Sequence, residues 1–277
     1  MTVRDFVRGI FSGDERSFAL SKTDKVNIRW QGKHFSELTE AEQRRIRNTT
    51  IHAIIFAQQK EPQNEDTSLF QVFERINTSG RTLTAQEIRN CVAQGPFNKL
   101  LIKLNDNPTW RDLFGLPTPD LRMRDMEFIL RFFALSSEDY KNGTQERLSL
   151  RKFLDIYMRK HSALSEVEQA NMEERFVESI KAASILFGNS AFHNISPSDS
   201  TRLVQKFSPT VFDSILIAID SAIRRGISNP ENPAQRKLIL LQDERYKFVI
   251  SQETMRRTSI NDRINKASNF IFGVEYE

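Results

Sequence analysis

The chain has 277 residues, of which 39% are hydrophobic and 27% are charged, and its formal net charge is +4. These values are typical of globular proteins and exclude collagenous, disordered and disulfide-stapled classes. The single cysteine, Cys91, cannot form an internal disulfide, and the four histidines are too scattered to predict a zinc site.

No segment of the sequence is typical of membrane insertion or secretion. The longest apolar runs, near residues 53–57 and 215–219, are far shorter than the roughly 20 residues that span a bilayer. The first residues carry several charged side chains and no continuous apolar region, unlike a secretory signal. We therefore expect a cytoplasmic protein that does not contact a membrane.

The N-terminal part predicts a mixture of helices and strands. Helical spacing of apolar residues from Val3 to Phe11 predicts an amphipathic helix that begins near Met1 and ends at Gly13. Alternating residues in 17–20 and 26–30 predict a hairpin, and Thr39 followed by Glu42 predicts a capped helix at 40–47. The isoleucine-rich run 50–57 predicts a buried strand.

The next segment predicts two helices joined by a tight polar turn. Apolar residues between 69 and 76 mark one helical face, and residues 77–80, Asn-Thr-Ser-Gly, predict its end. Thr84 and Glu87 form a second capping-box pattern, so we interpret Glu87 as a cap and not as an acid catalyst. The second helix is predicted to bury Ile88, Cys91 and Val92 and to stop at Gly95 and Pro96.

From about residue 97 onward the apolar spacing predicts almost only helices, with loops at 188–200 and 226–233. Pro117 and Pro119 indicate a boundary, so we predict an α+β domain at 1–116 and a helical domain at 117–277.

Most motifs that carry catalytic chemistry are absent from the sequence. We find no glycine-rich phosphate loop, no Gly-x-Ser-x-Gly elbow and no His-Glu-x-x-His pair. His193 and Asn194 are adjacent, but no second histidine lies at a useful distance for a metal-dependent nuclease. We therefore predict that His193 lies in a surface loop.

The turn at 77–80 is a candidate anion site. Asn77, Thr78 and Gly80 lie before a helix N-terminus, whose free amides favour anions, and Arg75 and Arg89 flank the turn. Amides, Asn77 and arginine forks together fit a phosphate group. Two capped helices with solvated arginines fit the same spacing, and the residues alone leave both interpretations open.

Residues Phe73 to Asn90 closely resemble a signature of the N-terminal domain family of GmrSD-type, modification-dependent restriction endonucleases, a ParB-like nucleotidase family. The resemblance continues at residues 124–135, 187–192 and 257–273 and so covers nearly the whole chain. It implies a remnant of a small mixed-sheet ParB-like nucleotidase core followed by a mostly helical domain. It also implies a bacterial or phage-associated protein that couples recognition of modified DNA to nucleoside-triphosphate hydrolysis.

The family's Asp-Gly-Gln-Gln-Arg loop normally precedes the helix that resembles residues 2–11, and this sequence begins after it. We therefore expect no NTP hydrolysis by this polypeptide as it stands; NTP with a divalent metal becomes a cofactor only if that motif is supplied. No room is left for an HNH nuclease domain, so a nuclease partner or second subunit is an expected partner.

Clustered arginines in the helical part suggest DNA as a further partner. The candidate DNA-binding residues are Arg122, Arg124, Arg256, Arg257 and Arg263. For any one such cluster, a solvated helix face is the favoured interpretation. The resulting alternatives are a domain of a restriction or anti-phage system that binds NTP or modified DNA, a non-catalytic DNA-sensing subunit, and an inactive truncated remnant.

Overall fold

The computed structural model describes residues 3–10, 17–50, 70–72, 75 and 82–276. The chain divides into two compact units, residues 1–60 and residues 61–277, which we describe separately as unit 1 and unit 2. The predicted boundary at 116/117 lies inside unit 2, where residues on both sides of it, such as Trp110 and Ile129, share one hydrophobic core.

Unit 1 is built from short elements around four buried apolar side chains. Its described elements are α1 (Val3–Arg8), the 3-10 turn η1 (Phe35–Glu37) and α2 (Glu40–Arg47). The Phe6 ring centroid lies 5.3 Å from that of Phe18 and 5.7 Å from that of Phe35, and Leu38 completes this core. The helix predicted from residue 1 to 13 is therefore shorter, with the chain turning at Gly9, where φ is +78°.

The capping box of α2 is confirmed, whereas the hairpin predicted at 17–30 is wrong. The Thr39 amide donates to Glu42 Oε2 over 2.9 Å, and Glu42 also accepts the Trp30 indole N–H over 2.8 Å. These bonds, with that of Trp30 first, lower the pKa of Glu42 to about 2. Residues 27–30 form a turn, and Ala19 instead makes an isolated bridge with His34. Of the apolar residues in this alternation, Trp30 packs against the core of unit 1, whereas Ile28 is exposed, so the pattern does not mark a strand.

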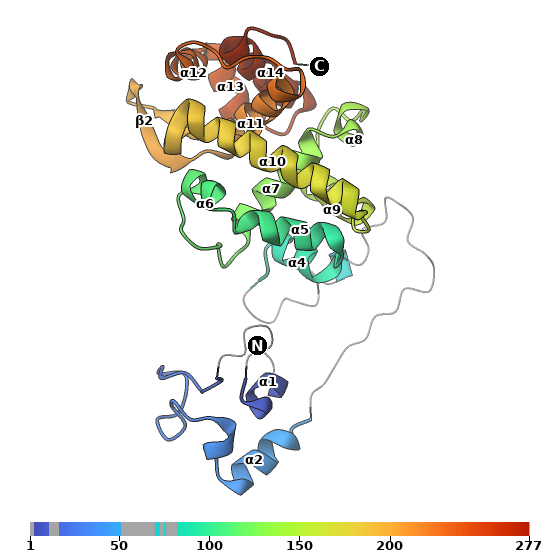
Figure 1. The fold of residues 1–277 in the computed structure, drawn as a ribbon, viewed down its shortest axis with the longest axis vertical. Coiled ribbons are helices and arrows are strands. Elements are labelled where there is room, and N and C mark those ends of the chain that lie inside the picture. Colours follow the sequence, from blue (N-terminus) through green and yellow to red (C-terminus); the bar gives the residue numbers. More distant parts are fainter. Residues whose placement is uncertain (1–2, 11–16, 51–69, 73–74, 76–81, 277) are drawn as a thin grey trace. The chain divides into compact units, whose positions relative to one another are not determined.

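Unit 2 is mostly helical (Figure 1). Its described helices and strands are α4 (Ala85–Val92), α5 (Pro96–Asn105), α6 (Pro108–Phe114), α7 (Arg124–Leu135), α8 (Glu138–Lys141), α9 (Leu150–Lys160), α10 (Glu166–Phe187), η3 (Gly188–Ser190), β1 (His193–Ser196), β2 (Asp199–Phe207), α11 (Pro209–Arg224), α12 (Pro233–Gln242), α13 (Glu244–Ser251), α14 (Arg257–Ala267) and the π-helical turn η4 (Ser268–Phe272). The predicted strand at 50–57 lies outside the described residues except for Thr50, and so do most of the residues between this strand and residue 82.

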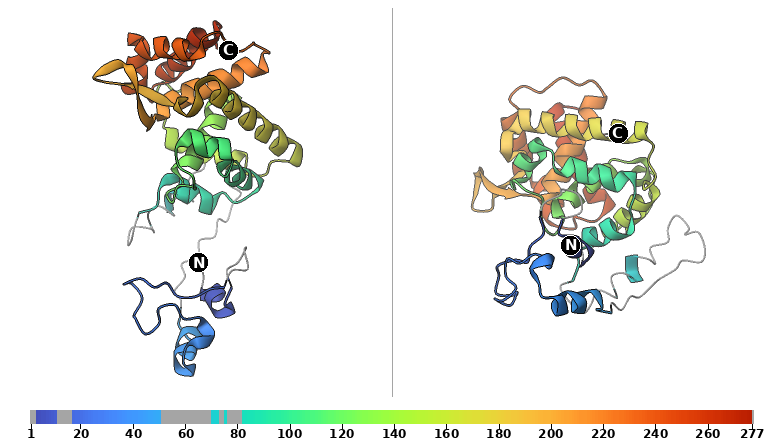
Figure 2. Two further views of the ribbon diagram at one scale, coloured as in Figure 1. Left: turned by 60° about the vertical axis from the view of Figure 1, so that its left-hand side comes forward. Right: turned by 60° about the horizontal axis from the view of Figure 1, so that its bottom comes forward.

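Helix α11 forms the centre of unit 2. Every residue from Val211 to Ala222 is buried, because α7, α10, α13 and α14 pack around it (Figure 2). Aromatic rings fill the space beside it: Trp110 lies 5.6 Å from Phe212 and 5.8 Å from Phe176, measured between ring centroids. The two carboxylates of this stretch, Asp213 and Asp220, are paired with arginines, so the helix can be buried on all sides.

Residues 188–200 are not the predicted loop. Strands β1 and β2 pair antiparallel, with Ile195 opposite Leu203, and they form the one sheet in the described part of the chain. The coarse α+β class therefore fits, although the sheet lies in the part that we predicted to be helical. Among the described residues, no helix is both long and apolar enough to cross a membrane.

Candidate functional site

The predicted phosphate turn is described only at its edges. Arg75 is exposed, while Asn77, Thr78 and Gly80 lie outside the described residues. The second capping box is confirmed: the Thr84 amide donates to Glu87 Oε2 over 2.6 Å, and the Glu87 amide donates to Thr84 Oγ1 over 3.1 Å. Glu87 is thus a cap of α4, as predicted.

Arg89 lies in the interior of unit 2 and is not exposed to solvent beside the predicted phosphate turn. Its side chain is 0% exposed, and its Nε–H donates to Asp155 Oδ1 over 2.6 Å. Its Nη1 group donates to Glu127 Oε2 over 2.9 Å and to Gln86 Oε1 over 3.1 Å. Burial raises the pKa of Asp155, against the opposing effect of Arg89. The guanidinium predicted to face a phosphate therefore joins α4 to α7 and α9.

Cys91, predicted to be buried, is exposed.

Arg122 and Arg124 make local contacts at the start of α7. Arg122 Nη2 donates to the Thr82 carbonyl oxygen over 2.7 Å, and Thr84 Oγ1 donates to the Arg122 carbonyl oxygen over 3.1 Å. Arg124 pairs with Asp120, and its side chain is 68% exposed. Arg122 thus holds the segment before α4 in place, whereas Arg124 projects into solvent.

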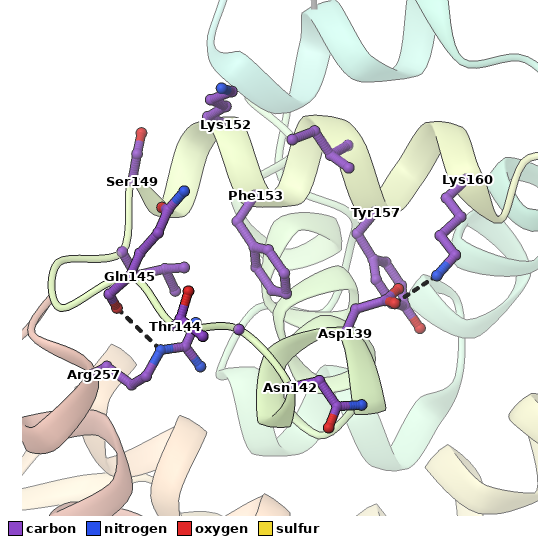
Figure 3. Close-up of a pocket in the computed structure, with 13 residues that line it drawn as sticks. Asp139, Asn142, Thr144, Gln145, Ser149, Lys152, Phe153, Tyr157, Lys160 and Arg257 are labelled. Atoms are coloured by element: carbon purple, nitrogen blue, oxygen red, sulfur yellow. Dashed lines mark hydrogen bonds and ion pairs between the residues drawn. The ribbon is translucent and has the colours of Figure 1, made fainter. Parts of the chain in front are cut away.

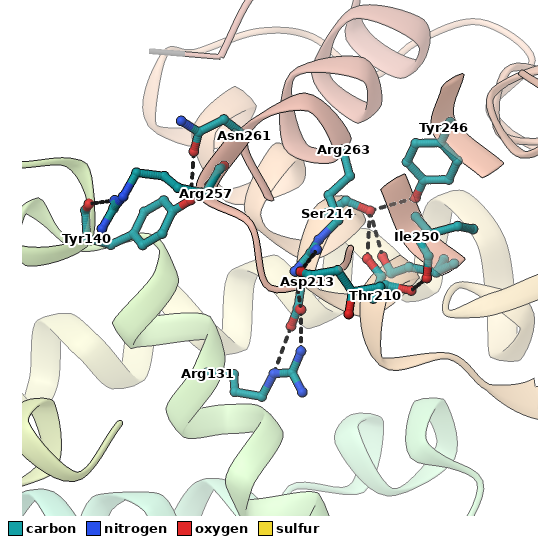
Figure 4. Close-up of polar contacts among 12 residues, drawn as sticks. Arg131, Tyr140, Thr210, Asp213, Ser214, Tyr246, Ile250, Arg257, Asn261 and Arg263 are labelled. Atoms are coloured by element: carbon teal, nitrogen blue, oxygen red, sulfur yellow. Dashed lines mark hydrogen bonds and ion pairs between the residues drawn. The ribbon is translucent and has the colours of Figure 1, made fainter. Parts of the chain in front are cut away.

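Arg263 is also an interior residue, with 0% of its side chain exposed. Its Nη2 group donates to Asp213 Oδ2 over 3.0 Å, and its Nη1 group donates to the Thr254 carbonyl oxygen over 2.7 Å. Arg131 donates to both oxygens of the same carboxylate (Figure 4). Such a residue offers no cation to DNA, but it fixes the turn that leads into α14.

The remaining two candidates, Arg256 and Arg257, lie beside a segment more than a hundred residues earlier in the chain. Arg147 and Arg256 form an antiparallel bridge. The Leu148 amide donates to the Met255 carbonyl oxygen, and the Arg257 amide donates to the Glu146 carbonyl oxygen, both over 2.9 Å. These backbone bonds place the two arginines of the α14 N-terminus next to the loop between α8 and α9.

Two adjoining cavities open at this place. One, of about 390 Å³, lies between α8, α9 and Arg257; the other, of about 520 Å³, lies between residues 147–149 and 253–256. Leu148 and Ser149 line both. We define the basic rim as the cations around the two cavities: Arg147, Lys152, Lys160, Arg256 and Arg257.

The cations of the basic rim are only partly neutralised. Lys160 pairs with Asp139, and Arg256 pairs with Glu253 over 2.9 Å and lies 3.8 Å from Glu146. Arg147 and Lys152 are exposed and have no ion pair among the described residues. Sequence reasoning found Arg256 and Arg257 but missed the other three, because their proximity arises from the long-range backbone pairing.

His193 lies in strand β1, half-buried, and not in the surface loop that we predicted. Burial lowers its pKa, and the charge of Lys237 lowers it further. Lys237 is itself 2% exposed, its ammonium donates to the Ser190 carbonyl oxygen, and burial lowers its pKa to about 7. Within the described ranges, no group of three or more histidine, cysteine, aspartate or glutamate side chains is placed to hold a metal ion.

The comparisons with known proteins add no family to this geometry. No family model matches the chain, and neither a curated protein nor a solved structure matches it.

Proposed function

We propose that this chain is a DNA-binding component of a bacterial or phage-associated restriction or anti-phage defence system, and that the basic rim of unit 2 contacts the DNA backbone. The defence context comes from the resemblance of residues 73–90 to the GmrSD-type N-terminal domains. The same resemblance carries the proposal of a ParB-like core around the turn at 77–80, which lies outside the described residues.

The observation that supports DNA binding is the convergence of exposed cations near the α8–α9 loop with the half-buried Arg256 and Arg257 at the α14 N-terminus. Arginine forks and lysine ammonium groups are the usual partners of phosphate oxygens. Arg147 and Lys152 have no carboxylate partner among the described residues. A ligand can therefore bind these two cations without breaking an ion pair.

A sensing role is better supported than NTP hydrolysis. Nucleotide binding at the signature turn was predicted to use Arg89, whose guanidinium is instead buried among Asp155, Glu127 and Gln86. Arg75 is the one described candidate of that turn that faces solvent. A nuclease or second subunit stays an expected partner, because the proposed role includes no DNA cleavage.

The test is a titration of duplex DNA followed by fluorescence anisotropy at several salt concentrations. If the rim binds phosphates, log Kobs falls linearly with log salt, with a slope of about −0.9 for each phosphate neutralised. We expect the double variant Arg147→Gln/Arg256→Gln to weaken binding to all sequences and to reduce the slope by about 2 if each arginine neutralises one phosphate.

The matched control is Arg202→Gln/Lys206→Gln, which removes two exposed cations from strand β2 of the same unit. This control should leave the affinity and the slope of the wild type unchanged. Absent or salt-independent binding by the wild type would overturn the proposal. NTP hydrolysis with Mg²⁺, lost in Asn77→Ala, would favour the nucleotidase interpretation instead.

A further inference from the structure

The smaller cavity, of about 390 Å³, has an aromatic wall in addition to its cations. Phe153 and Tyr157 are four residues apart on α9 and therefore lie on one face of the helix. Their ring centroids are 6.4 Å apart, and both side chains point toward the loop that carries Thr144 (Figure 3). Tyr157 is almost fully buried, whereas Phe153 is half-buried, so Phe153 is the ring that a ligand reaches.

One edge of this cavity is formed by a fixed guanidinium. Arg257 Nε–H donates to the Gln145 carbonyl oxygen over 3.1 Å, its Nη1 group donates to the Tyr140 carbonyl oxygen, and its Cζ atom lies 4.5 Å from the Tyr140 ring centroid. Gly143 makes this placement possible, because a Cβ there would lie 2.3 Å from Arg257 Nη2. The guanidinium is thus immobilised before any ligand arrives, and it keeps N–H groups beyond the two used by these carbonyls.

The charge and polarity of the remaining lining complete the site. Lys152, Lys160 and Arg257 line the cavity against one carboxylate, Asp139, which is already paired with Lys160. Asn142, Thr144 and Gln145 supply amide and hydroxyl groups that can donate and accept hydrogen bonds. An aromatic wall, a fixed cation and adaptable polar groups in one cavity of this size match the chemistry of a nucleotide.

We propose that this cavity binds one nucleotide unit, with its base stacked on Phe153 and its phosphate held by Arg257 and Lys152. The inference rests on the proposed DNA-binding function, for which the unit is an unpaired nucleotide of a DNA strand. A free deoxynucleoside monophosphate has the same chemistry, so the experiment separates the two sources.

The probe is 2-aminopurine, whose fluorescence falls when it stacks on an aromatic ring. Three samples are titrated with the full chain: a short single strand that contains 2-aminopurine, the same strand fully paired in a duplex, and free 2-aminopurine deoxyriboside monophosphate. For the wild type we expect quenching of the single strand upon binding, and tighter binding of that strand than of the free monophosphate.

The main variant is Phe153→Leu, which keeps an apolar side chain but removes the stacking ring. We expect about a tenfold loss of affinity for the single strand and loss of the quenching, with duplex affinity and its salt slope unchanged. Gly143→Ala displaces Arg257 but keeps the Phe153 ring. It should therefore weaken single-strand binding, while the strand that still binds is quenched. Thermal unfolding checks that both variants fold. If Phe153→Leu does not fold, the test rests on two other variants: Phe153→Tyr, which keeps the ring and should keep the quenching, and Gly143→Ala.

The outcomes separate the two proposals. Duplex binding without quenching of the wild-type single strand, or equal losses for single strand and duplex in Phe153→Leu, would overturn the cavity proposal and leave the proposed function standing. Quenching of the free monophosphate with no DNA binding would overturn the proposed function and assign the cavity to a free nucleotide. No binding of any probe would overturn both.

Discussion

Arginines in the interior of unit 2 and Arg147 of the basic rim occur in similar runs of sequence, yet their exposure and their ion pairs differ. Arg89 and Arg263 are 0% exposed and donate to carboxylates and backbone carbonyl oxygens from neighbouring helices. Arg147 is exposed and has no ion pair among the described residues. An arginine cluster in a sequence therefore says little about DNA until the structure shows which of its charges are already neutralised inside the protein.

The largest loss of unfolding free energy is expected where one buried carboxylate pairs with two buried cations. Asp213→Ala leaves the guanidinium groups of Arg131 and Arg263 without their shared partner, and we expect a loss of about 3–5 kcal/mol of unfolding free energy. Urea denaturation followed by circular dichroism measures it. The control is Asp262→Ala, which breaks an exposed pair with Arg245 and should cost at most about 1 kcal/mol. Equal costs for both variants would contradict the distinction between buried and exposed ion pairs.

The next largest loss of unfolding free energy is expected at Arg89, which was predicted to contact phosphate. Arg89→Met leaves Asp155 buried without its main donor, and we expect a loss of about 2–3 kcal/mol of unfolding free energy. The double variant Arg89→Met/Asp155→Leu should recover part of that loss, because no unpaired charge is left. Duplex DNA affinity should stay at the wild-type level in both; a specific loss of affinity in a stable variant would place Arg89 in the binding site after all.

The third effect uses Lys237, a buried cation that is bound to a carbonyl oxygen. Burial lowers its pKa from 10.5 to about 7 in the folded chain, so between these values the unfolded chain binds more protons. Stability should therefore rise with pH across this window, by about 1.4 kcal/mol per pH unit from this group. Lys237→Met should lack that contribution and be the more stable protein at pH 7. Unfolding curves between pH 7.5 and 9.5, within the window, measure the difference in slope; parallel slopes for the two proteins would contradict it.

The smallest effect on stability is expected at the basic rim. Arg147→Gln removes an exposed side chain that has no ion pair among the described residues, so the free energy of unfolding should change by less than about 0.5 kcal/mol. The magnitude of the salt slope for duplex binding should nevertheless fall by about 0.9. A stable variant with an unchanged slope would remove Arg147 from the DNA contact.

Sequence reasoning succeeded where the signal is local. The capping boxes of Thr39 with Glu42 and of Thr84 with Glu87 are confirmed, because a cap depends on residues three positions apart. It failed for the hairpin at 17–30 and for the strands at 193–207, because a short apolar alternation is too little to predict a strand or to exclude one. In α14 one signal was available: Arg263 is three residues after the buried Ile260 and next to the buried Ile264, on the apolar stripe.

The candidate site was predicted only in part, for a physical reason. Arg256 and Arg257 were identified as candidate DNA-binding residues, but their neighbours Arg147, Lys152 and Lys160 come from a distant segment. Their proximity depends on backbone bonds between residues 146–148 and 255–257, and no local pattern encodes that pairing. The phosphate turn itself lies mostly outside the described residues, so Asn77, Thr78 and Gly80 stay predictions.

The bridge between Arg147 and Arg256 also sets an order of events during protein synthesis. A ribosome-bound chain acquires Lys152, Phe153 and Lys160 roughly a hundred residues before Arg256 and Arg257. Long-range pairing of this kind forms only after both segments have emerged. A polypeptide that terminates before residue 253 therefore keeps Arg147, Lys152 and Lys160 but lacks Arg256 and Arg257, so the complete basic rim forms only after the N-terminus of α14 has emerged.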